Sequence, residues 1–240
     1  MLDSNPDWNA LEDIPVDVLT TVLTYHVVSG DVRSTDLSTG YVESLSATPF
    51  GVNASLFFNT DGGVTINGTS TVTGADNVVS NGVIHVIDQV ILPANIVTFA
   101  TSNPMFSSLV AALTRTDLSV DFVAALSGDG PLTVFAPTND AFQALLDGNA
   151  DWNTLADIPA SVLESVLLYH VTSAGNVRST DLSDGQNVPT LLENNNFTIN
   201  LSGTTPVINA TMNNANIIAT DVQAINGVVH VIDAVILPQL

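Results

Sequence analysis

Four histidines are the residues of this chain best suited to acid–base or metal chemistry, and they form two equivalent pairs. His26 and His85 recur 144 and 145 positions later as His170 and His230. Two neighbouring imidazoles can share a proton or a metal ion at neutral pH. The alternative is structural, because His170 lies on the apolar face of an expected helix and His230 within an apolar run, where ring nitrogens bond the backbone. We favour the structural interpretation for both pairs.

Other patterns that would indicate catalysis or metal binding are absent from the sequence. It has no cysteine and no HExxH, G-x-S-x-G, Walker or Rossmann pattern. Acidic residues are plentiful, but no spacing singles out a pair of carboxylates, and the ordered spacing of an EF-hand is missing. We therefore predict a protein that is not an enzyme and that has no cofactor and no metal site.

The charge of the chain excludes further classes of partner. Among the 240 residues, 24 are acidic and 3 are basic, which gives a formal net charge of −21. This charge argues against binding to nucleic-acid phosphates or to anionic membrane surfaces. No apolar run is long enough for membrane insertion. The partners that we expect are a surface protein or a polysaccharide.

Two nearly identical stretches hold two of the four histidines. Asn81–Pro93 reads NGVIHVIDQVILP, and Asn226–Pro238 reads NGVVHVIDAVILP. Each joins an Asn-Gly turn signal to a β-branched run that ends at proline, which predicts a strand covered on both faces. Because the copies lie 145 positions apart, we predict a tandem of two domain-sized units at 1–94 and 95–240.

The second unit is predicted to run helices, a strand, helices and then several strands. A helix is expected from Pro104, a strand at Leu132–Ala136, and a helix capped by Thr138. We expect residues 94–102 to form a short, stiff junction. Partial segregation of helices from strands indicates the α+β class.

The first unit is expected to be incomplete. Met1 corresponds to Leu145 of the second copy, so counterparts of about 95–144 are missing from the first. A missing strand would expose a sheet edge and a core face. Two explanations stay open: the sequence is a piece of a longer chain, or a neighbour completes the unit through self-association.

Three ordered segments resemble the signature segments of the fasciclin, or FAS1, domain. They are TVFAPTNDAF at 133–142, Tyr169-His170, and NGVVHVIDAVILP at 226–238, and the last two recur in the first unit. The resemblance implies an α+β wedge of two small β-sheets with a layer of helices, present as one partial and one complete unit. It also implies an extracellular or cell-surface protein of cell adhesion. The first unit departs from the family because it lacks the TVFAPTNDAF segment.

The same resemblance supplies a candidate adhesion contact around the Tyr-His motif. The alternative is that the tyrosine and the histidine are buried and hold a helix to the sheet, and that the aspartate before the helix is a cap. The residues of this candidate contact are Tyr169, His170, Tyr25, His26, Asp157 and Ile158.

Two arginines also occupy equivalent positions, within the sequence VRSTDL. We expect Arg33 and Arg178 to pair with aspartates, such as Asp181 or one across the domain. A role in anchoring a ligand is the alternative.

Three functions follow from these patterns. The favoured one is a non-catalytic binding or adhesion module. The second is a small-molecule-binding or hydrolytic protein that uses a pocket between helices and sheet, which would require polar groups to converge there. The third is assembly, in which a neighbour completes the first unit.

Overall fold

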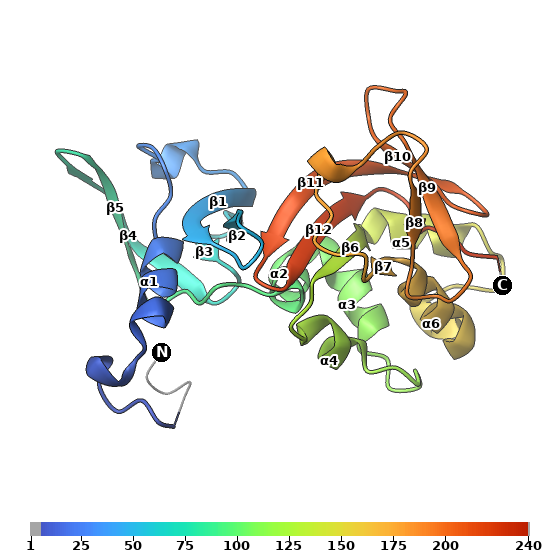
Figure 1. Ribbon diagram of the computed structural model, residues 1–240, viewed down its shortest axis with the longest axis horizontal. Helices are drawn as coiled ribbons and strands as arrows, with labels where there is room; N and C mark the ends of the chain where they lie inside the picture. Colours follow the sequence, from blue (N-terminus) through green and yellow to red (C-terminus); the bar gives the residue numbers. More distant parts are fainter. Residues whose placement is uncertain (1–5, 240) are drawn as a thin grey trace. The chain divides into compact units, whose positions relative to one another are not determined.

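The computed structural model describes residues 6–239, which fold into two compact units. The first ends along the chain at Ala94, and the short segment Gln223–Ile225 groups with it. The second runs from Asn95 and holds the remaining described residues. Both units combine helices with a β-sheet (Figure 1), which confirms the predicted α+β class.

In its described residues, the first unit contains one α-helix and a five-stranded sheet in the order β1-β2-β3-β4-β5. All neighbouring strands are antiparallel, and β4 and β5 form a hairpin whose outer strand is β5. Its elements are η2 (Leu11–Asp13), α1 (Val16–Tyr25), η3 (Ser34–Asp36), β1 (Gly40–Ala47), β2 (Asn53–Asn59), β3 (Thr65–Ile66), β4 (Ser70–Val79) and β5 (Gly82–Ile87).

The second unit contains more helices and a seven-stranded sheet in the order β7-β6-β12-β11-β10-β9-β8. Its helical elements are α2 (Ile96–Ser102), η4 (Pro104–Phe106), α3 (Ser107–Leu113), α4 (Phe122–Ser127), α5 (Asn139–Asp147), η5 (Leu155–Asp157), α6 (Ala160–Tyr169) and η6 (Ser179–Asp181). Its strands are β6 (Leu132–Pro137), β7 (Val171–Thr172), β8 (Asn187–Pro189), β9 (Asn196–Asn200), β10 (Val207–Asn209), β11 (Asn214–Ala224) and β12 (Gly227–Ile232).

The strand β12 lies in the centre of the second unit, as its apolar sequence predicts. All six of its residues are buried, and β12 pairs in parallel with β6. The register places His230 opposite Phe135, and the two rings stack with their centroids 5.4 Å apart. Thr138 follows β6 and caps α5, because its side chain accepts the Ala141 N–H, so the predicted cap is confirmed.

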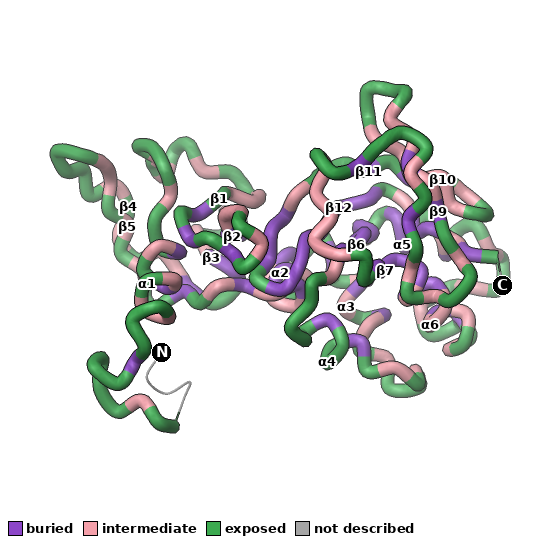
Figure 2. The backbone as a smooth tube through the Cα atoms, viewed as in Figure 1, coloured by how far each residue is buried: buried purple, intermediate pink, exposed green. Residues whose placement is uncertain are grey.

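The equivalent strand β5 does not have the predicted cover on both faces. Its residues alternate between half-buried and exposed, although its sequence is almost that of β12 (Figure 2). The physical reason is that, among the described residues, β5 pairs only with β4 and has no partner corresponding to β6. The prediction of a strand buried on both faces is therefore correct for β12 and wrong for β5.

The segment predicted as a simple junction also contains a helix. α2 begins after Asn95, whose side chain accepts the N–H of Thr98 at 2.8 Å, and it buries Ile96 and Phe99. A seven-residue helix rich in β-branched residues gives little helical periodicity in the sequence, which explains why the helix itself was not predicted.

No single helix within residues 6–239 is both long and apolar enough to cross a bilayer. One pair, Ile96–Ser102 with Pro104–Leu113, meets the length and composition only when joined, and it is bent by 97°.

Candidate functional site

The Tyr-His motif of the second unit lies at the end of α6, and its polar atoms bond to the protein backbone. Tyr169 is fully buried, and its hydroxyl donates to the carbonyl of Asn196 at 3.0 Å. His170 Nδ1 lies 2.6 Å from the carbonyl of Val166, and its Nε2 accepts the N–H of Ile236 at 3.1 Å. The second bond assigns the proton to Nδ1. The motif therefore ties α6 to the chain that follows β12.

Burial also determines the charge of this histidine. Loss of water around the ring lowers the pKa of His170 from 6.5 to about 4, because the charged form loses its hydration. The ring is therefore neutral at physiological pH, with both nitrogens in use. A general base needs a free lone pair and a titration near neutral pH, and His170 has neither.

The first unit repeats these bonds in a more open setting. The Tyr25 hydroxyl donates to the Ser55 carbonyl at 2.6 Å and accepts from the Asn67 side chain at 2.9 Å. Burial raises the pKa of Tyr25 to about 12. His26 bonds the carbonyl of Val22 at 2.7 Å and accepts the Ile91 N–H at 3.0 Å, yet its side chain is exposed.

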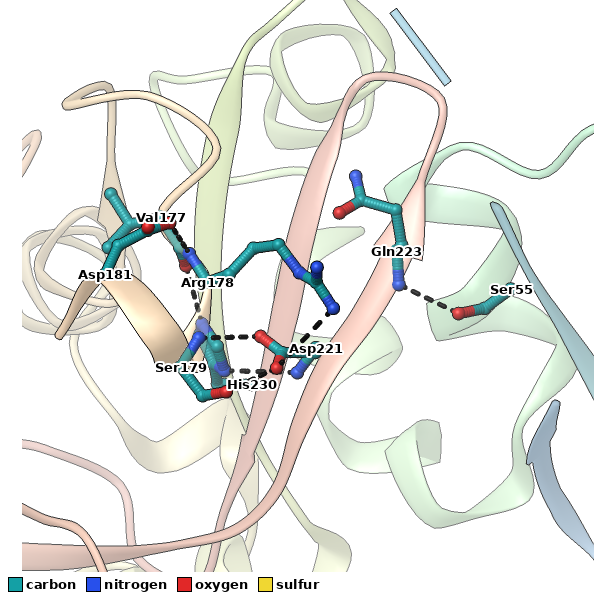
Figure 3. A network of polar contacts seen from close by, with 8 residues as sticks. All are labelled: Ser55, Val177, Arg178, Ser179, Asp181, Asp221, Gln223 and His230. Carbon is teal, nitrogen blue, oxygen red and sulfur yellow. Dashed lines mark hydrogen bonds and ion pairs between the residues drawn. The ribbon is translucent and has the colours of Figure 1, made fainter. Parts of the chain in front are cut away.

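The second histidine of each unit belongs to a network with serine, aspartate and arginine, and Figure 3 shows the network of the second unit. His230 Nε2 donates to the Val177 carbonyl at 2.9 Å, and its Nδ1 accepts the N–H of Asp221 at 3.4 Å. Asp221 in turn accepts the N–H of Ser179 at 2.7 Å and the Ser179 hydroxyl. Arg178 Nη2 lies 3.8 Å from Asp221.

This network resembles a catalytic triad in composition but differs in its connections. A nucleophilic serine would bond to the histidine, which would bond to the carboxylate. Here the Ser179 hydroxyl bonds to Asp221, while both nitrogens of His230 bond to backbone groups. Asp221 has φ of 62°, a left-handed conformation that aspartate tolerates better than most residues. The network therefore fixes a turn against β12.

The first unit contains the same network, except that its arginine pairs with a different aspartate. Ser34 donates its N–H to Asp76 at 2.8 Å, and His85 Nε2 bonds the Val32 carbonyl at 2.9 Å. Arg33 pairs with Asp31 at 3.1 Å, whereas Arg178 pairs with the aspartate of the network.

Both arginines thus lie beside an aspartate, as the sequence predicted. Asp181, the partner named from the sequence, instead accepts the backbone N–H of Arg178 at 2.9 Å.

The other candidate contact residues lie at the turn before α6. Asp157 is exposed, and its carboxylate accepts the N–H groups of Thr154 and Asn153 at 2.7 and 2.9 Å. These bonds, that of Thr154 first, lower the pKa of Asp157. Ile158 is buried, and its carbonyl accepts from Arg115 at 2.8 Å.

Comparison with known proteins assigns the fold a family. The fasciclin-domain profile matches residues 6–93 and 104–238. The chain belongs to the fasciclin-domain family. Its fold is similar to that of a FAS1 domain pair from the insect cell adhesion molecule fasciclin I. The TM-score is 0.57 at 20% identity, over 92% of this chain and 79% of the other.

Relatives of this fasciclin chain occur in bacteria and animals. Protein sll1483 of Synechocystis sp. is 41% identical over 145 residues, 60% of this chain and 74% of that protein. Human periostin is 30% identical over 249 residues, 98% of this chain but only 28% of periostin. Cell surface glycolipoprotein MPB83 of Mycobacterium bovis is 34% identical over 148 residues, 60% of each chain.

An apolar cavity of about 160 Å³ lies in the second fasciclin unit, between helices and sheet. Side chains from α2, α3, α4, β6, β12 and α6 line it, and nearly all are hydrocarbon. His170 reaches the lining, but its nitrogens are already bonded. The cavity thus lacks the converging polar groups that a hydrolase would need. Within residues 6–239, no three His, Cys, Asp or Glu side chains cluster as metal ligands.

The structure shows one important polar residue whose role was not predicted from the sequence. Asn226 precedes β12 and is buried; its side chain donates to the carbonyls of Leu126 and Gly128 and accepts the N–H of Ile96 at 3.0 Å. It therefore ties the end of α4 to the start of α2. From the sequence, Asn226 was predicted only to form part of an Asn-Gly turn. Its hydrogen-bond partners lie about 100 or more positions away in the chain, so no local pattern indicates them.

Proposed function

We propose that this fasciclin tandem is an extracellular or cell-surface binding module for adhesion, and that it acts without catalysis. The observation that carries the proposal is that the side chains of the repeated motifs are already occupied by contacts within the fold. The rings of Tyr169, His170 and His230 are buried, and their polar atoms bond to backbone groups. Such side chains stabilise a rigid scaffold whose surface is free to bind.

The names of the relatives support the location and the kind of activity. One is a cell surface glycolipoprotein, and the similar solved structure comes from a cell adhesion molecule. With a net charge of −21, the chain would bind surface proteins or polysaccharides through cationic groups or bridging cations.

Within the candidate contact, we propose that Asp157 touches the partner and that the other members support it. Asp157 is exposed in the turn before α6 and its neighbour Ile158 is buried, while Tyr169 and His170 are buried at the other end of that helix. Tyr25 and His26 would have the same supporting role in the first unit. A carboxylate in this position suits a basic side chain or a bridging calcium ion.

The test is attachment of cells, and binding of purified polysaccharides and matrix proteins, to the immobilised full chain. We expect attachment that weakens with added salt or depends on calcium. Asp157→Asn should reduce it, while Asp17→Asn, a substitution of an exposed aspartate in the other unit, should not. Absence of binding at every salt and calcium concentration would refute the adhesion proposal. Equal binding by both variants would refute the role of Asp157.

The apolar cavity favours a second candidate function, the binding of a small apolar molecule. A hydrocarbon-lined cavity of about 160 Å³ is of the size that accepts benzene or xenon. Shifts of methyl resonances of Val229 and Leu109 on addition of benzene would support this function. Equal shifts after Ala100→Phe, which would fill the cavity, would refute it.

A further inference from the structure

A line of uncharged polar residues crosses four neighbouring strands in the sheet of the second unit (Figure 1). Asn187 of β8 is opposite Thr198 of β9, which on its other side is opposite Asn209 of β10. Asn209 is in turn opposite Asn214 of β11. We call this line of four residues the polar row.

The polar row lies on the face of the sheet that points away from the core. Side chains alternate between the two faces along a strand. The residues next to the members of the row are buried in the core cluster, namely Val188, Phe197, Ile208 and Ala215. All four members of the row are themselves exposed or half-buried. Because the strands are held in ladders, binding at this face does not require the backbone to become ordered.

The side chains of the polar row are not engaged within the fold. Among residues 6–239, none of them has a hydrogen-bond partner. Nearby asparagines differ, since Asn213 donates to the Val235 carbonyl at 2.8 Å and Asn216 donates to the Asp233 carboxylate at 2.6 Å. An asparagine amide has two donor hydrogens and an acceptor oxygen. The row therefore presents unused donors and acceptors at positions that the sheet fixes.

The strands that carry the polar row are nearly free of charge, although the chain has a net charge of −21. β8, β9 and β10 contain no acidic or basic residue. The charged residue of β11 is Asp221, whose carboxylate bonds to Ser179. A face of amides and a hydroxyl without charge suits a ligand that is itself uncharged and rich in hydroxyl groups.

The spacing of the row indicates the shape of that ligand. Neighbouring strands lie about 4.8 Å apart, which is close to the length of one hexose in an extended, cellulose-like chain. We propose that the polar row binds an uncharged, extended polysaccharide that runs across β8 to β11. The inference rests on the proposed function of a binding module, for which it names one ligand class and a surface other than Asp157.

The test is an NMR titration of the isotope-labelled full chain with cellohexaose. The side-chain amide resonances of Asn187, Asn209 and Asn214 should shift together and saturate with one-to-one stoichiometry. Unchanged resonances would overturn the inference. Maltohexaose contains the same sugar in a chain that curls, so it should bind at least tenfold more weakly. Equal affinity for the two oligosaccharides would overturn the fit to an extended chain.

Two variants of the row and one matched control make the test specific. Asn209→Ala and Asn214→Ala should each weaken binding about fivefold, because the hydrogen bonds of one amide are lost. Gln143→Ala removes an exposed side-chain amide from α5, outside the sheet, and should bind like the wild type. Wild-type affinity in both row variants would overturn the inference. The resonance shifts are measured on the wild type, so they decide the question even where a variant is unstable.

Failure of this inference can be told apart from failure of the adhesion proposal. Cell attachment by a chain that does not bind cellohexaose would overturn the role of the polar row alone. Cellohexaose binding by a chain to which no cells attach would support the row and overturn adhesion alone. Asn209 also lies in an N-x-T sequence. A glycan found on it by mass spectrometry of the natural protein would cover the row and overturn the inference.

Discussion

Replacement of His170 should remove much of the pH dependence of the second unit below neutral pH. In the folded unit the ring is buried and neutral, and its pKa is lowered to about 4. In the unfolded chain it takes up a proton near its ordinary pKa of 6.5. Between these values the unfolded state binds more protons than the folded state. The stability conferred by the neutral ring is thus complete above pH 6.5 and is lost as the pH falls toward 4.

The size of this effect follows from the two pKa values. From pH 7.5 to pH 5.0, linkage gives a loss of about 2 kcal/mol from His170 alone. Burial also lowers the pKa of His230, so that residue contributes in the same direction. The wild type should therefore lose more than this amount, and His170→Gln should lose about 2 kcal/mol less than the wild type.

Urea unfolding at both pH values measures the difference. Trp152 reports on the second unit when Trp8 is replaced by phenylalanine in every variant. The control is His26→Gln, which removes the equivalent histidine from the first unit and should leave the Trp152 transition unchanged. Because only the change with pH is compared, a general loss of stability in His170→Gln does not affect the test. Parallel losses of stability in wild type and His170→Gln would refute the buried, neutral state of His170.

Four further substitutions test the packing. Gly227→Ala should destabilise the second unit by more than about 4 kcal/mol, because the added methyl group clashes with the Leu132 carbonyl. Gly82→Ala should leave the free energy of unfolding of the first unit within about 0.5 kcal/mol of the wild-type value. Thermal unfolding of both variants compares them directly. Tyr25→Phe should cost the first unit about 1–3 kcal/mol in urea unfolding, because it leaves buried hydrogen-bonding groups unpaired. Asn226→Ala should cost about 3 kcal/mol, since three backbone groups, two of them buried, lose their partner, and a wild-type midpoint would contradict that role.

Much of the fold could be predicted because the sequence contains two copies of the same motifs. The repeated NG-x-x-H strand, the Tyr-His motif and the Thr138 cap each have a local signal, and the α+β class follows from their order. The site residues were harder to place. The sequence identified His170 and His230 and gave the structural alternative, but not the backbone groups that bond them.

The failures have a common physical cause. β5 and β12 share nearly the same residues, yet only β12 is buried, because burial depends on β6, which lies far away in the chain. Asn226 likewise depends on partners in α2 and α4. A local sequence pattern predicts whether a segment forms a helix or a strand. Whether that element is buried depends on segments far away in the chain, which a local pattern does not include.

Amide hydrogen exchange along β5 and β12 tests this dependence on β6 most directly. The alternate amides of β12 that face β6 should exchange with the global unfolding of the second unit. Those at the same positions of β5 should exchange at least about 100-fold faster, because they face a free edge. Equal protection of the two strands would contradict the account, since it would mean that β5 is covered as fully as β12.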